Sequence, residues 1–231
     1  MAAALDEPAV ELHDLGRDYG ERVALRDVTI TVPASATLAV LGPNGAGKST
    51  LLRVLATLLR PHRGRVRVLG RDVPGEGWAV RARLGLLAHE PLLYRDLSGR
   101  ENLRYQARLF GIDDGRAEEL LERTGMTRRA DEPLRTLSRG MVQRLAVCRV
   151  VLHDPALLLL DEPLANLDPA AVDAVEPLIG RGTGRTRVVT GHDPVAALRD
   201  ADLVLGLRGG RAAIAGAAAD VTQDDVRALY R

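Results

Sequence analysis

The sequence predicts an α/β protein with a largely parallel sheet and an inserted helical lobe. Short apolar segments alternate with helical ones along the 231 residues, as they do in proteins of this class. The run ALLLL at 156–160 is too short for a buried helix and suits a central parallel strand. Residues from about 75 to 153 are more helical and more polar. We therefore expect one domain over 1–231, with 75–153 as the lobe.

The elements follow from local patterns taken in chain order. Early apolar or alternating segments at 10–15, 28–32 and 37–42 predict strands. From Ser49, leucine and valine recur on one helical face, which predicts a helix that Pro61 ends. Further predictions are a strand at 65–70, helices over 101–111 and 116–125 that each end at a glycine, a strand within 185–193 and a closing hairpin at 201–216.

Composition excludes several classes of protein. Acidic and basic residues nearly cancel, at a formal net charge of +1, which gives no general reason to expect nucleic acid or anionic lipid as a partner. The arginines of 60–67 alternate along a predicted strand as one solvated face, and no aromatic platform accompanies them. The single cysteine, Cys148, excludes an internal disulfide framework; we expect a small buried hydrophobe there rather than a reactive thiol.

Lysine is used once. Of 32 basic residues, only Lys48 is a lysine, and arginine stands at every other basic position. A compact ammonium and a planar guanidinium are not equivalent where a tight loop must receive a phosphate. This usage singles out Lys48.

One glycine-rich segment satisfies the phosphate-binding pattern G-x-x-x-x-G-K-[ST] between a predicted strand and a predicted helix. Its glycines let backbone N–H groups turn toward a β-phosphate, and the helix N-terminus adds a favourable dipole. We expect Lys48 to reach the β- and γ-phosphates and Ser49 to ligate Mg²⁺; the alternative is an ordinary tight turn. The residues assigned to ATP here are Gly42, Pro43, Asn44, Gly45, Ala46, Gly47, Lys48, Ser49 and Thr50.

Two adjacent carboxylates follow the apolar run of 157–160. Asp161 is expected to reach the Mg²⁺ shell through water, and Glu162 to polarise the water that attacks ATP. The alternative is a helix N-terminus with acidic first-turn residues, since Pro163 is compatible with that position. The phosphate loop upstream favours the catalytic interpretation.

Together these motifs resemble the nucleotide-binding subunit of an ABC transporter over nearly the whole chain. The resemblance implies a P-loop NTPase (RecA-like) core with an N-terminal antiparallel β subdomain and an inserted helical lobe. Residues 137–141 stand where that family has its LSGGQ signature: Ser138 and Gly140 match, whereas Arg139 and Met141 depart. In the family, two subunits pair head to tail and this helix end binds the γ-phosphate held by the partner. Arg139 either adds a charge near that phosphate or points to solvent.

The same resemblance assigns three more residues. Asp168 matches the D-loop and is expected to reach across the dimer. His192 resembles the switch histidine that contacts the γ-phosphate; a lone histidine is usually structural, but its position after a strand favours function. Tyr19, 23 positions before Gly42, resembles the aromatic that stacks on adenine, with a core position as the alternative.

One position departs from the family pattern. His89 stands where the family usually carries the Mg²⁺-contacting glutamine, and imidazole is a poorer partner for a hard, oxygen-seeking cation. Either His89 contacts the γ-phosphate or its water, or Mg²⁺ uses one fewer protein ligand. Glu90 offers no clear alternative.

The branch of the family is assigned by resemblance alone. Residues 89–111, 137–145 and 152–155 are similar to the ATP-binding subunit of the haem exporter in bacterial cytochrome c maturation. A drug- or lipid-type exporter subunit is the alternative. A soluble ATPase acting on DNA or ribosomes is a second, and a regulatory module that only binds nucleotide is a third.

The resemblance also implies partners and a location. They are an integral membrane subunit and a second ATPase subunit, in a homodimer or a pseudo-symmetric heterodimer, with no nucleic acid expected. The start MAAALDEP lacks a basic, apolar signal, and no segment has the ~20 apolar residues that span a bilayer. We expect a cytoplasmic protein, peripheral on the inner face of the membrane.

Overall fold

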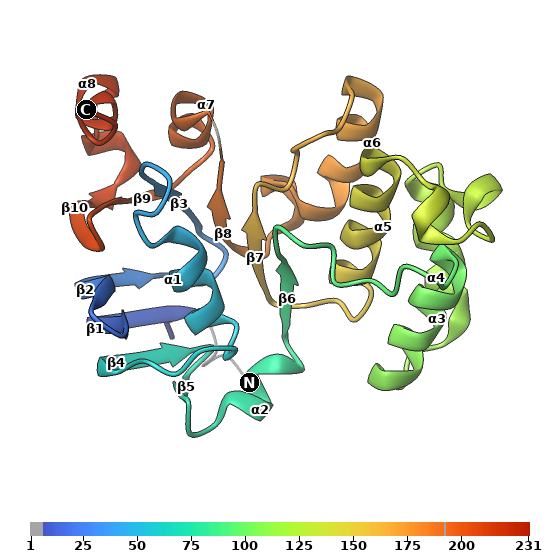
Figure 1. The fold of residues 1–231 in the computed structure, drawn as a ribbon, viewed down its shortest axis with the longest axis horizontal. Helices are drawn as coiled ribbons and strands as arrows, with labels where there is room; N and C mark the ends of the chain where they lie inside the picture. The colour runs from blue at the N-terminus through green and yellow to red at the C-terminus, as the bar shows by residue number, and fades with distance from the viewer. Residues whose placement is uncertain (1–6, 192) are drawn as a thin grey trace.

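The computed structural model describes residues 7–191 and 193–231, and its main feature is a six-stranded sheet with the order β10-β9-β3-β8-β7-β6 (Figure 1). The five strands from β9 to β6 run parallel, and β10 pairs antiparallel with β9. The strands of this sheet are β3 (Thr37–Leu41), β6 (Leu84–Leu87), β7 (Leu157–Asp161), β8 (Thr186–Thr190), β9 (Leu203–Arg208) and β10 (Arg211–Ala217).

A second, four-stranded antiparallel sheet has the order β2-β1-β4-β5 and lies beside one end of the first (Figure 1). A backbone hydrogen bond of 2.8 Å from Arg26 N to Gly210 O links β2 to the turn between β9 and β10. This is the antiparallel subdomain that the family resemblance implied. Its strands are β1 (Val10–Tyr19), β2 (Arg22–Val32), β4 (Arg63–Val68) and β5 (Arg71–Val73).

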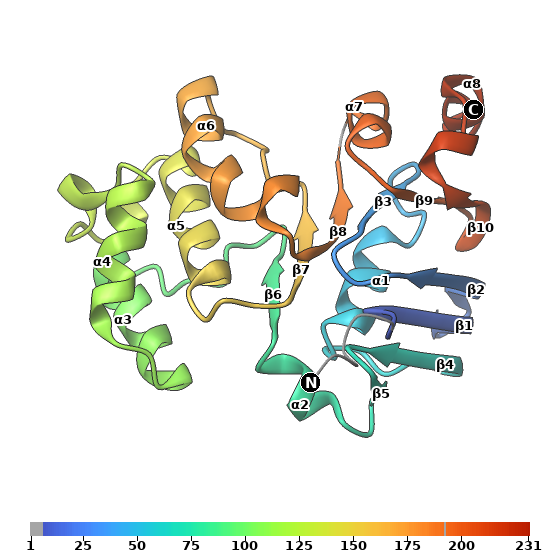
Figure 2. The ribbon, with the colours of Figure 1, turned by 180° about the vertical axis from the view of Figure 1, so that it is seen from behind.

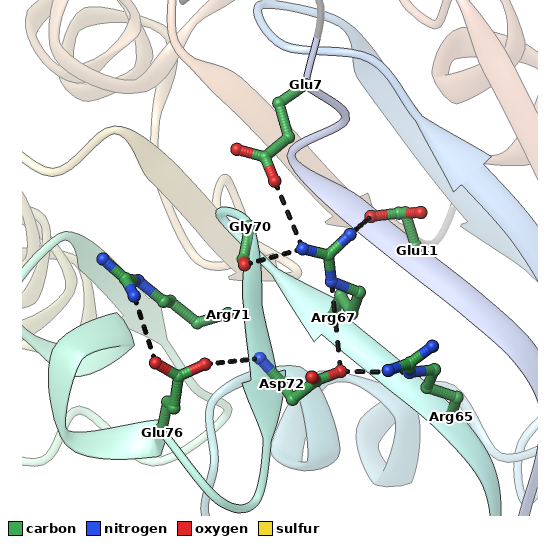
Figure 3. A network of polar contacts seen from close by, with 8 residues as sticks. All are labelled: Glu7, Glu11, Arg65, Arg67, Gly70, Arg71, Asp72 and Glu76. Carbon is green, nitrogen blue, oxygen red and sulfur yellow. Dashed lines mark hydrogen bonds and ion pairs between the residues drawn. The ribbon is translucent and has the colours of Figure 1, made fainter.

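An arginine-centred network covers one face of this small sheet (Figure 3). Arg67 donates to Glu11 at 3.1 Å, to Glu7 at 3.3 Å and to the carbonyl of Gly70 at 3.0 Å. The neighbouring Arg65 donates to Asp72 at 3.1 Å. Arg65 and Arg67, two of the arginines that the sequence placed on a solvated strand face, are therefore ion-paired within the chain.

Helices cover both faces of the main sheet and form a lobe at one end. The lobe contains α3, α4 and α5, which pack together beyond β6 and β7 (Figure 2). The α-helices are α1 (Lys48–Leu55), α2 (Gly77–Arg81), α3 (Gly99–Phe110), α4 (Asp114–Arg123), α5 (Arg139–Val151), α6 (Pro169–Ile179), α7 (Pro194–Arg199) and α8 (Gln223–Ala228). Short 3₁₀ turns are η1 (Thr127–Arg129), η2 (Leu134–Thr136), η3 (Arg181–Thr183) and η4 (Ala218–Asp220).

Two helices of the lobe end close to the glycines that the sequence indicated. Helix α3 starts in a capping box between Ser98 and Glu101 and ends at Gly111, whose φ is 65°. Helix α4 ends just before Gly125, which also has a φ of 65°. Residues 75–153 also contain β6, which is a strand of the main sheet. Cys148 on α5 is fully buried, as expected, and burial raises the pKa of its thiol to about 11.

The helix predicted from Ser49 to Pro61 is shorter in the structure. Helix α1 ends at Leu55, and Thr57 follows in the left-handed region with a φ of 62°. Leu58 N bonds to Arg53 O at 2.9 Å and Thr57 N to Val54 O at 3.0 Å. This pair of bonds is a Schellman cap, formed here without a glycine, so the apolar periodicity beyond it misled the prediction.

Candidate functional site

The loop from Gly42 to Gly47 joins β3 to α1 and has a backbone that requires glycine at its turns. Gly42, Gly45 and Gly47 have φ of 137°, 80° and 113°. A Cβ on Gly42 would lie 2.2 Å from Leu207 O, and one on Gly47 would lie 2.4 Å from Ala24 O. The loop is therefore packed tightly against both sheets, and only glycine fits at its two ends.

Lys48 is the first residue of α1 and folds back over this loop. Its Nζ donates to Gly42 O at 2.7 Å and to Pro43 O at 3.1 Å. Burial lowers the pKa of Lys48, while the charges of Glu162 and Asp161 raise it. The ammonium thus lies between a phosphate-binding loop and two carboxylates.

A hydroxyl, a carboxylate and a second hydroxyl meet at the ends of β7 and β8. Ser49 Oγ donates to Asp161 Oδ2 at 3.1 Å, and Thr190 Oγ1 donates to Asp161 Oδ1 at 2.6 Å. Parallel pairing of Asp161 with Thr190 in the sheet brings these two side chains together. Asp161 is held by hydrogen bonds at both of its oxygens.

The oxygen donors here fit Mg²⁺. A serine hydroxyl and one carboxylate are the kind of small protein ligand set that Mg²⁺ uses when phosphates and water complete its shell. Among residues 7–191 and 193–231, no group of three or more His, Cys, Asp and Glu side chains is arranged to hold a metal by itself.

Glu162 follows Asp161 with an unusual backbone. Its φ is 54°, a left-handed value that costs energy for a residue with a side chain. Its N–H donates to Thr190 Oγ1 at 3.1 Å and to Thr190 O at 3.3 Å. Thr190 therefore contacts the side-chain carboxylate of Asp161 and the backbone N–H of Glu162.

A cavity of about 330 Å³ joins most of the residues that the sequence singled out. Tyr19, Lys48, Asp161, Glu162 and the part of the glycine loop from Asn44 onward, except Ala46, line it, although they come from three separate stretches of the chain. His89, from the loop after β6, lines it too. The full lining is Tyr19, Arg22, Ala24, Asn44, Gly45, Gly47, Lys48, Ser49, Thr50, Arg53, His89, Asp161 and Glu162.

Tyr19 lies at the rim of this cavity and not in the core. Its side chain is 43% exposed, which argues against the core position considered from the sequence. The guanidinium of Arg17 lies 5.1 Å from the centre of its ring. An aromatic ring at the mouth of a phosphate-binding cavity can stack on a planar base.

Ser138, Gly140 and Asp168 do not line this cavity. Ser138 is exposed and caps α5, accepting from Met141 N at 3.3 Å. Asp168 caps α6, accepting from Ala171 N at 2.8 Å. A Cβ on Gly140 would lie 2.9 Å from Asn166 O, so the helix start packs against the segment before α6. His192 lies outside the described residues.

The structure adds residues that sequence reasoning missed. Thr190 is the main one, and its only signal was its position at the end of an apolar strand beside β7. Arg22 and Arg53 line the cavity without belonging to a motif. Tyr230, near the C-terminus, accepts a 3.1 Å hydrogen bond from Gly42 N, a contact across 188 positions that no local pattern predicts.

Comparison with known proteins places this site in a family. Residues 25–165 match the family described as ABC transporter. The chain belongs to the ABC transporter family. The structure has the ABC ATPase fold, with a TM-score of 0.85 and 27% identity to a solved ATP-binding subunit of an ABC transporter, over 95% of this chain and 98% of that one. A dimeric cassette bound to ADP and phosphate, at a TM-score of 0.82 and 24% identity over 90% and 98% of the two chains, shares the fold.

Curated ABC proteins are similar over much of this chain. A daunorubicin resistance ATP-binding protein of Streptomyces coeruleorubidus is 42% identical over 77% of this chain and 58% of its own length. A Nod factor export protein of Sinorhizobium fredii is 33% identical over 94% and 65%. A phosphonates import protein of Anaeromyxobacter dehalogenans is 37% identical over 96% and 48%. The chain thus spans about half to two thirds of these relatives.

Proposed function

We propose that this chain is the ATP-binding and ATP-hydrolysing motor of an ABC exporter. The observation that carries the proposal is the single cavity in which the Lys48 loop faces Asp161 and Glu162. A polyphosphate needs backbone N–H groups and a cation, and hydrolysis needs a carboxylate beside the attacking water. The family and the ABC ATPase fold support the same chemistry.

Each residue of the cavity has a role in this proposal. The loop from Gly42 to Thr50 holds the β- and γ-phosphates, and Lys48 neutralises their charge. Ser49 and Asp161 hold Mg²⁺, which offsets negative charge on the transferred phosphate. Tyr19 stacks on adenine. Glu162 orients the attacking water, and His89 contacts the γ-phosphate or that water.

The residues outside the cavity act on a second copy or a related chain. Ser138 and Asp168 are exposed caps of α5 and α6 that do not line the nucleotide cavity. We propose that Ser138 and Gly140 bind the γ-phosphate held by the partner, and that Asp168 completes the same interface. His192 is assigned to the γ-phosphate by its place in the sequence. A solved cassette of the same fold is dimeric, and the proposed dimer is head to tail as the family resemblance implies.

The cargo follows from the relatives rather than from the site. Two of the similar proteins are named for daunorubicin resistance and for Nod factor export. These names favour a drug- or lipid-type exporter over the haem exporter suggested by motif resemblance. The phosphonate relative is an importer, so the direction of transport rests on the other two. Haem export stays a prediction that these comparisons do not support.

A separate membrane subunit completes the proposed transporter. No helix among the described residues has the length and apolarity to cross a bilayer. A solved relative, 26% identical with a TM-score of 0.79 over 96% of this chain and 93% of its own, is described as part of a three-component ABC transporter complex. We propose that residues 75–153 transmit closure of the dimer to the membrane subunit on the inner face of the membrane.

Glu162→Gln tests the proposed chemistry. The variant should bind ATP normally and form a stable nucleotide-bound dimer, because the loop and Lys48 are unchanged. Turnover should fall by about 10²-fold or more, since the general base is lost. Phosphate release, equilibrium ATP binding and size-exclusion chromatography give the three readouts.

Glu122→Gln, an exposed change on α4, is the matched control and should turn over like the parent. Parent-like hydrolysis by Glu162→Gln would remove Glu162 from the mechanism. Stimulation of the parent by DNA or ribosomes, but not by membranes, would instead favour the soluble ATPase.

A further inference from the structure

A second cavity, of about 320 Å³, lies beside the nucleotide cavity, and among the described residues the two share only Glu162. It is bounded by α6, α7 and the face of β8 and β3 between them. Figures 1 and 2 show β7 and β8 between α6 and α7 from both sides of the molecule. The proposed ATPase mechanism does not use this cavity.

The walls of this second cavity are mostly apolar. Side chains alternate along β8, so Arg187 and Val189 face the cavity while Val188 packs in the core on the opposite face. A cavity of this size with a largely apolar surface is typical of a small-molecule site. The apolar lining comprises Ala39, Leu160, Pro163, Leu164, Ala165, Ile179, Val189, Ala196 and Ala197, and the polar lining comprises Thr37, Glu162, Glu176, Arg187, Thr190, Asp193 and Asp200.

Arg187 is the exception among these residues. It is 8% exposed, in a strand whose neighbours on both sides belong to a parallel sheet. A strand buried in this way ordinarily carries apolar side chains, and arginine is almost never buried without a partner. Its presence requires a physical account.

Nothing in the described part of the chain pairs with Arg187. Its Nε is buried without a hydrogen-bond partner there, and no described carboxylate oxygen lies within 4.0 Å of its guanidinium. Glu176 and Asp200 line the same cavity and act on Arg187 only through longer-range charge. These two acids would repel an added anion, so the cavity favours a neutral hydrogen-bond acceptor.

We propose that this cavity binds an uncharged, largely apolar organic molecule whose carbonyl oxygen accepts a hydrogen bond from Arg187. The apolar body of the molecule lies between α6 and α7 against Val189 and Ile179. The oxygen reaches the end of the cavity where β8 begins. Such a ligand supplies the acceptor that Arg187 lacks and covers the apolar walls.

The other end of the cavity connects it to the nucleotide site. Thr190, Gly191 and Glu162 line that end, and Thr190 is three positions along β8 from Arg187. Thr190 holds both Asp161 and the Glu162 backbone. An occupant therefore fixes the Thr190 end of β8 and changes the rate of ATP hydrolysis. This last consequence alone rests on the proposed ATPase function.

Benzophenone and diphenylmethane are matched probes, because they share two phenyl rings and differ at the carbonyl. Binding is measured on the whole chain without nucleotide, so the result does not depend on ATPase activity. Benzophenone should bind about tenfold more tightly than diphenylmethane, as expected for one hydrogen bond to a charged donor. On illumination benzophenone should cross-link to residues of α6, α7 or β8, read by mass spectrometry.

Arg187→Met keeps much of the side-chain volume and removes the donor. It should bind the two probes with equal affinity, while Arg199→Met, an exposed change on α7, should keep the tenfold preference. If Arg187→Met does not fold, the difference in affinity between the two probes and the positions of the cross-links, both measured on the parent, still test the proposal. Equal affinities on the parent, cross-links outside α6, α7 and β8, or no saturable binding would overturn the proposal.

Discussion

The hydroxyl of Thr190 donates a 2.6 Å hydrogen bond to Oδ1 of Asp161, the carboxylate whose other oxygen accepts from Ser49. Neighbouring parallel strands deliver the two side chains to the same edge of the sheet. Because the N–H of Glu162 also donates to Thr190, one threonine holds the carboxylate of Asp161 and the backbone of Glu162. The site is thus organised by a residue to which the sequence alone assigned no role.

Thr190→Val removes this hydroxyl and keeps the shape of the side chain. We expect turnover to fall about tenfold and the Mg²⁺ concentration for half-maximal activity to rise, because Asp161 loses one of its two fixed contacts. Steady-state kinetics over a Mg²⁺ titration measures both quantities. Thr186→Val, on the same strand and also buried, is the control and should leave the Mg²⁺ dependence unchanged. A parent-like titration for Thr190→Val would contradict the positioning role.

Arg67→Lys tests the network of the small sheet (Figure 3). Arg67 reaches Glu11 with Nη1 and both Glu7 and the Gly70 carbonyl with Nη2, and one ammonium cannot reproduce that fork. We expect a loss of about 1 kcal/mol in the free energy of unfolding, measured by denaturant titration. Arg65→Lys is the control, because Arg65 is exposed and bonds only to Asp72; its effect should be close to zero. Equal effects of the two changes would contradict the account.

The burial of His153 leads us to predict that the stability of the protein depends on pH. It stacks on Phe110 with ring centres 4.1 Å apart, and burial lowers its pKa below 6.5. The unfolded chain therefore binds a proton more readily than the folded one. The stability due to neutral His153 is complete above pH 6.5 and is lost as the pH falls through the lower folded value.

Melting temperatures across this range test that prediction in two variants. His153→Gln can still donate to Leu84 O, the present partner of Nε2, and should lack the loss of stability below pH 6.5. His13→Gln, at an exposed side chain, should keep the parental profile. Identical slopes in the parent and His153→Gln would contradict the assignment.

The sequence predicted the parts of the site that depend on local geometry. The pattern from Gly42 to Thr50 works through consecutive backbone groups, so its residues alone indicate the loop. The run before Asp161 is apolar because the strand is buried on both faces, and this made β7 recognisable. The glycines that follow α3 and α4 and the small buried Cys148 followed from equally local rules.

The parts of the fold and of the site that the sequence did not predict depend on packing between distant segments. Thr190 and Tyr230 contact the site only after β8 joins β7 and the C-terminus folds back to Gly42. Thr57 ends α1 in a conformation that its residue type disfavours, so no cap signal preceded it. Arg187 gave no signal in the sequence, because the chain is rich in arginine and only the structure shows that this one is buried.

The central claim is that Lys48 and the backbone of its loop bind the phosphates of ATP. Calorimetric titration of ATP into Lys48→Ala tests it most directly, with circular dichroism to confirm that the variant folds. We predict that the dissociation constant rises by about 10²-fold or more, because a charge-assisted contact to phosphate is lost from a partly buried site. An unchanged dissociation constant in the folded variant would contradict the claim.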